Sequence, residues 1–132
     1  PLVVGEIPDM HDAKQHIRAE QIPAPDTLRG ANERLRAWAK GRERTLVLPM
    51  ASWIESLRGG TLVLPPRFRG SEEESFPPEV ALRSDRLHPS EVGQLVLAAW
   101  LYVSLDEWLK PKESDFKLDP AEFRKRLERA RK

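Results

Sequence analysis

Apolar and polar positions along the chain predict a strand, a helix and a second strand in its first fifty residues. Residues 2–7 form a short, mostly β-branched apolar run closed by Pro8 and Asp9, which is typical of a buried parallel strand ending in a turn. Residues 45–49 predict the next strand. The helix between them would then be a right-handed crossover that joins two parallel strands.

The crossover helix is indicated by apolar residues at helical spacing. Pro25 precedes it, Asp26 or Thr27 can cap its start, and Gly41 is placed to cap its end. We expect one face to contact the core. That face carries Leu28, Ala31, Leu35, Trp38 and Ala39.

The second half of the chain predicts fewer strands and a long buried helix. Residues 51–57 predict a short helix, and residues 61–65 repeat the sequence Thr-Leu-Val-Leu-Pro of the second strand, so we expect a further strand or an extended edge there. Residues 92–105 are too apolar for a surface helix and predict one packed against a sheet, with Ser90 as its N-cap.

Length and composition narrow the class of protein. The 132 residues suffice for one domain with a real core, and a formal net charge of +1 gives no electrostatic argument for nucleic acid or a membrane surface. No run reaches the ~18 apolar residues of a membrane span. The absence of cysteine excludes thiolate chemistry and leaves the cellular compartment open. Because the chain opens inside a predicted core strand, we expect it to be part of a longer polypeptide.

The most informative residues are Asp85 and His88, which are followed by Pro89 and the predicted helix. A carboxylate and an imidazole three residues apart can meet across one turn, where the carboxylate fixes the imidazole tautomer and leaves the other ring nitrogen free to act as a base. A structural interpretation stands beside this one, in which the aspartate only caps a turn.

The same residues, Asp85, His88, Pro89 and Gly93, followed by the apolar helix, resemble the last sequence block of the SGNH (GDSL-type) hydrolase family. The phrase Val-Val-Gly-Glu-Ile-Pro-Asp near the start is similar to that family's fourth strand. The resemblance extends over residues 2–109. It implies an α/β fold, a three-layer α/β/α domain with a mostly parallel sheet, also flavodoxin-like in outline.

On that resemblance, residues 1–110 would be the C-terminal part of such a domain. Residues 111–132 would be an extension with an amphipathic basic helix, which we expect to be exposed at the terminus.

The family resemblance implies a serine esterase or lipase-like hydrolase without a cofactor. His88 would be the general base and Asp85 its orienting carboxylate. The family's nucleophile and oxyanion-hole blocks are absent, and none of the eight serines has a nucleophile-like context. The chain alone would therefore be inactive. Its expected partners are the N-terminal portion of the domain, as a separate chain or cleaved segment, and a small ester or acyl substrate.

Two other interpretations of the fold and function remain open. The chain can be a non-catalytic SGNH-like binding or structural module, or an unrelated flavodoxin-like domain in which the Asp-x-x-His spacing is accidental. His11, Asp12 and His16 are conceivable metal ligands, but five residues separate the two histidines rather than the four that place both on one helical face. We therefore expect exposed polar residues and no metal.

Overall fold

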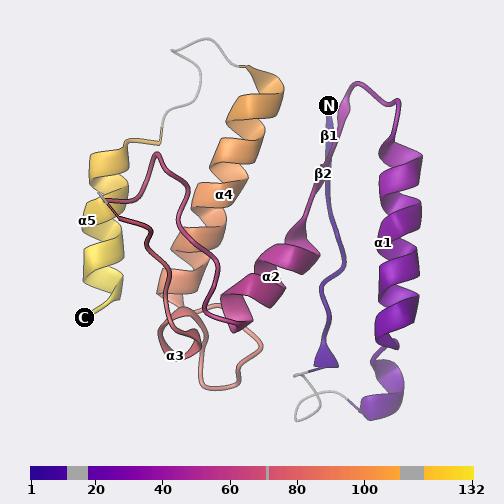
Figure 1. The fold of residues 1–132 in the computed structure, drawn as a ribbon, viewed down its shortest axis with the longest axis horizontal. Coiled ribbons are helices and arrows are strands. Elements are labelled where there is room, and N and C mark those ends of the chain that lie inside the picture. The colour runs from indigo at the N-terminus through magenta and orange to yellow at the C-terminus, as the bar shows by residue number, and fades with distance from the viewer. Residues whose placement is uncertain (12–17, 71, 111–117) are drawn as a thin grey trace.

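The computed structural model describes residues 1–11, 18–70, 72–110 and 118–132. Strands β1 (Leu2–Gly5) and β2 (Thr45–Leu48) pair in parallel, with Leu2 opposite Thr45, and helix α1 (Pro25–Ala39) lies along one side of them (Figure 1). The prediction of a mixed α/β chain with parallel strands joined by a helix is confirmed at this level.

Helix α1 ends as predicted but begins differently. Gly41 has a φ of 81°, the left-handed conformation that follows many helix ends, as predicted. The N-cap position belongs to Ala24, because Pro25 already occupies the first helical turn, so the prediction of Asp26 or Thr27 is wrong. Asp26 pairs with Arg29 instead, at 2.9 Å.

The predicted core face of α1 is only partly covered. Leu28 is buried, whereas Trp38 is exposed and stacks under the guanidinium of Arg42. The expectation that Trp38 packs in the core is therefore wrong.

The second copy of Thr-Leu-Val-Leu-Pro, residues 61–65, forms no strand but an extended segment. Leu62 and Leu64 are buried in the core. The backbone finds partners outside any sheet: the Val63 carbonyl accepts the indole N–H of Trp100 at 2.9 Å, and the Leu64 N–H donates to the Glu74 carbonyl at 2.7 Å. The prediction of a strand is wrong, and the segment is not an edge of the sheet either, because the sheet of the described residues contains only β1 and β2.

The core lies between helices and this extended segment. Helix α4 (Glu91–Leu109) packs against α3 (Pro78–Ala81), α5 (Pro120–Ala130) and residues 61–68, and it also touches β2. Helix α2 (Met50–Arg58) lies between α4 and the strands, and a short helix, η2 (Ala19–Gln21), precedes α1 (Figure 1).

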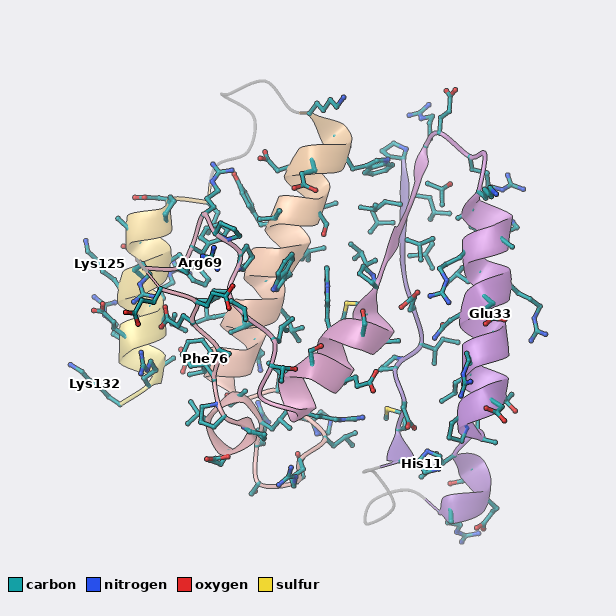
Figure 2. The ribbon with its side chains drawn as sticks, in the orientation of Figure 1. His11, Glu33, Arg69, Phe76, Lys125 and Lys132 are labelled. Carbon is teal, nitrogen blue, oxygen red and sulfur yellow. The ribbon has the colours of Figure 1, made fainter. Side chains whose placement is uncertain are left out.

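Helix α5 is docked on this core. Phe123 and Leu127 are buried, and the ring of Phe123 lies 4.8 Å from that of Phe68, while Lys125 and Lys132 extend outward (Figure 2). The expected amphipathic helix is thus confirmed, and most of its other residues are exposed, but Phe123 and Leu127 attach it to the core. No helix within the described ranges combines the length and the apolar character that a membrane span requires.

Candidate active site

A closed turn carries both residues singled out from the sequence. Leu82 and Pro89 form an antiparallel bridge at its base. Inside it, the Arg83 N–H donates to the His88 carbonyl at 2.8 Å, and the Arg86 N–H donates to the Arg83 carbonyl at 2.9 Å. Arg86 adopts a φ of 54°, an uncommon conformation for a side-chain-bearing residue. The turn is therefore held by its own backbone.

The start of α4 anchors this turn to the core. The Ser90 hydroxyl accepts the Gly93 N–H at 3.2 Å, which confirms the predicted N-cap, and it donates to the Val80 carbonyl at 2.6 Å. A Cβ on Gly93 would lie 2.0 Å from the Ala81 carbonyl oxygen. Gly93 therefore lets α4 approach the backbone of α3 closely.

The structure brings Asp85 and His88 together. Oδ2 of Asp85 lies 2.8 Å from Nδ1 of His88, while Oδ1 accepts the backbone N–H groups of Leu87 and His88 at 2.9 and 3.0 Å. An ionised carboxylate can only accept, so Nδ1 carries the proton and Nε2 of the neutral ring keeps its lone pair. Among the described residues, nothing hydrogen-bonds to Nε2.

The electrostatics of the turn favour an ionised aspartate. The hydrogen bond from the imidazole of His88, together with the backbone N–H groups of His88 and Leu87, holds the pKa of Asp85 well below its usual range. The Asp85 side chain is 25% exposed and that of His88 is 64% exposed. The aspartate is thus held in the turn while the imidazole is presented to solvent.

A second Asp–His pair, which the sequence did not suggest, follows β1. Oδ1 of Asp9 lies 2.7 Å from Nδ1 of His11 and also accepts the His11 N–H at 2.9 Å. Partial burial raises the pKa of Asp9, but the hydrogen bonds from His11 outweigh it and leave that pKa below its usual value. Figure 2 places His11 between the segment after β1 and helix η2.

The described residues give no support to a metal site formed by His11, Asp12 and His16. Asp12 and His16 lie outside the described residues. Within the part of the chain that is described, no three His, Asp or Glu side chains gather closely enough to hold a metal ion.

A cavity of about 600 Å³ lies at the carboxyl ends of the two strands. Helices α1 and α2 line its sides, and Glu6, Ile7 and Asp9, which follow β1, line it between them. Neither Asp85 nor His88 lines it. In Figure 1 the connection between α3 and α4, which contains Asp85 and His88, lies at the lower edge of the molecule, whereas β2 ends near the middle of the view, where α2 begins.

The serines do not complete a triad within the described residues. Ser52 lines the cavity but donates its hydroxyl to the Pro49 carbonyl at 2.9 Å, and Ser90 caps α4. No hydrogen bond in the ranges that the structure describes joins a serine to His88.

Comparison with known proteins returns no match to a family model, to a curated protein sequence or to a solved structure. A functional proposal therefore rests on the geometry of the residues and on the sequence pattern around His88.

Proposed function

We propose that this chain is the C-terminal portion of an SGNH-type ester hydrolase and contributes the aspartate and histidine of a Ser-His-Asp triad. The observation that carries the proposal is the contact of Asp85 Oδ2 with Nδ1 of an exposed His88, in a turn held at the start of a buried helix. Precise proton transfer needs this kind of support on a rigid element.

The chemistry follows from the tautomer. Nε2 of His88 accepts the proton of a serine hydroxyl as the serine Oγ bonds to the acyl carbon, and the carbonyl oxygen becomes an oxyanion. When the intermediate collapses, the bond to the leaving alcohol breaks and Nε2 returns the proton to the alkoxide. Water then removes the acyl group by the same steps. Asp85 stabilises the imidazolium throughout.

The serine and the oxyanion-hole donors belong, in this proposal, to an N-terminal portion of the same domain, supplied as upstream sequence or as a separate chain. The open edge of β1 supports such a partner. Leu2 and Val3 are 47% and 41% exposed, and β1 pairs only with β2 among the described residues. An exposed apolar edge strand is a template for another strand, and one more layer would complete a three-layer α/β/α domain.

The test is co-expression of the chain with the N-terminal portion, followed by assay on a short-chain p-nitrophenyl ester. We expect the His88→Ala variant to reduce kcat/KM on the order of 10⁶-fold. The His11→Ala variant, which removes the other hydrogen-bonded imidazole, is the matched control and should retain activity. Hydrolysis unchanged by His88→Ala would refute the assignment.

A non-catalytic SGNH-like module is the second candidate function, and one observation favours it. Oδ1 of Asp85 accepts two backbone N–H groups, which is also what an aspartate with a purely structural role in a turn does. Under this candidate the co-expressed protein folds but hydrolyses no ester, and His88→Ala changes neither property.

A further inference from the structure

The cavity at the carboxyl ends of the strands has features that the hydrolase proposal does not use. Ligands in parallel α/β sheets commonly bind outside the carboxyl ends of the strands. The buried polar side chains of the described residues are Glu6 and Asn32, and both line this cavity. Burying polar groups is costly unless each is hydrogen-bonded, so their concentration here needs a physical reason.

Asn32 fixes the segment that follows β1. Its Oδ1 accepts the Ile7 N–H at 2.8 Å, and its Nδ2 donates to the Ile7 carbonyl at 2.9 Å. The two bonds replace the strand partner that Ile7 lacks and hold the neighbouring Glu6 in a defined position.

Glu6 in turn positions an arginine. Its side chain is 4% exposed and accepts a hydrogen bond from Nη1 of Arg36, whose own side chain is 53% exposed and lines the cavity. A guanidinium has five N–H donors in a planar fork, so one bond to Glu6 leaves others for a ligand. Both members of this ion pair line the cavity, and the guanidinium is the more exposed of the two.

The other charged side chains that line the cavity are two arginines, Arg29 and Arg58, and two carboxylates, Asp9 and Glu55. Arg58 of α2 lines the opposite side and donates to the Asp9 carbonyl at 2.6 Å, and Arg29 lies two helical turns before Arg36 on the same face of α1. The Asp9 carboxylate is hydrogen-bonded to His11. Glu55, which is exposed, is the remaining acidic group in the lining.

We propose that this cavity binds a small organic anion, whose carboxylate or phosphate group is held by Arg36 and Arg58, with Glu6 as the positioning residue of Arg36. Guanidinium groups bind both kinds of oxyanion through paired, charge-assisted hydrogen bonds. The inference rests on α1, α2 and the segment after β1, and it stands or falls independently of the Asp85–His88 turn.

The test is calorimetric titration of the full chain with sodium acetate and, separately, sodium phosphate, against sodium chloride at matched ionic strength. We expect saturable binding of at least one oxyanion and none of chloride. The arm with the lower Kd identifies the chemical group. Heats from both oxyanions that merely match those from chloride would overturn the proposal.

The variants locate the binding. The double variant Glu6→Gln with Arg36→Gln avoids leaving a buried carboxylate unpaired, and it should raise Kd by roughly tenfold or more. Arg58→Gln should weaken binding to a similar degree and serves if the double variant does not fold. Arg42→Gln, at the distant Trp38, is the matched control and should leave Kd unchanged. Equal loss in the control, or full affinity in Arg58→Gln, would contradict the assignment.

Discussion

Two carboxylate–imidazole pairs in this chain make nearly the same contact but differ in their support. The distances from carboxylate oxygen to Nδ1 are 2.8 Å for Asp85 and His88 and 2.7 Å for Asp9 and His11. Asp85 uses both carboxylate oxygens: Oδ2 contacts the imidazole, and Oδ1 accepts two backbone N–H groups. Asp9 uses a single oxygen for both the ring and the backbone of His11.

The surroundings of the two Asp–His pairs also differ. Asp85 and His88 lie between the Leu82–Pro89 bridge and the capped start of α4. Asp9 lies on the segment after β1, with its side chain 48% exposed. The comparison teaches that a short Asp–His hydrogen bond alone does not distinguish a catalytic pair. In the proposed hydrolase the distinguishing feature would be the support of the aspartate, because the His88 side chain is 64% exposed and that of His11 only 37%.

The largest expected effect separates the pairs by activity. In the hydrolase completed with its N-terminal portion, Asp85→Asn should lower kcat on the order of 10⁴-fold, because an amide NH₂ facing Nδ1 favours the wrong tautomer. The asparagine carbonyl can still accept the backbone bonds of the turn, so folding should be retained. Asp9→Asn makes the same change in the other pair and should leave kcat unaltered. Equal losses of kcat in Asp85→Asn and Asp9→Asn, measured by steady-state ester hydrolysis, would show that the two pairs do not differ in function.

A smaller effect is expected on stability, through the packing of α4 against α3 that supports the Asp85–His88 turn. Gly93→Ala places a Cβ against the Ala81 carbonyl and should lower the free energy of unfolding by about 1–3 kcal/mol. Gly30→Ala is the matched control in α1, where a Cβ meets nothing within 4 Å, and it should be neutral or stabilising by about 0.5–1 kcal/mol. Chemical denaturation measures both. A Gly93→Ala variant as stable as the parent would mean that α3 and α4 are not closely packed.

The smallest effect concerns acid pH. Because hydrogen bonds hold the folded pKa of Asp85 below its unfolded value, ionisation of Asp85 stabilises the turn above about pH 4 and this stabilisation is lost as the pH falls further. The Leu87 amide resonance should report this loss in an NMR titration. In Asp85→Asn that resonance should not titrate, and a persistent transition there would assign it to another group.

The sequence predicted the contact between Asp85 and His88 better than it predicted the sheet, for a physical reason. Asp85 and His88 are three residues apart, so local turn geometry decides whether they meet. Thr-Leu-Val-Leu-Pro occurs twice, and only the copy at 45–48 lies beside another strand. Since strand formation depends on a partner, five identical residues at 61–65 form an extended segment instead.

The cavity could not be predicted because its contacts join distant parts of the chain. Glu6 and Arg36 are thirty residues apart, and Ile7 and Asn32 twenty-five. One local signal was present: Asn32 follows Leu28 by four residues, so a polar side chain occupies the buried face of an amphipathic helix. Such a residue indicates a specific hydrogen-bonded partner.

The most direct measurement is the tautomer of His88, read from imidazole ¹⁵N NMR spectra of the chain at neutral pH. With Asp85 orienting the ring, we predict that the neutral form of the His88 imidazole is protonated at Nδ1 and that this preference is lost in Asp85→Asn. The variants His11→Ala and His16→Ala assign the signals of the three histidines. A ring protonated at Nε2, or one whose tautomer is indifferent to Asp85→Asn, would contradict the account.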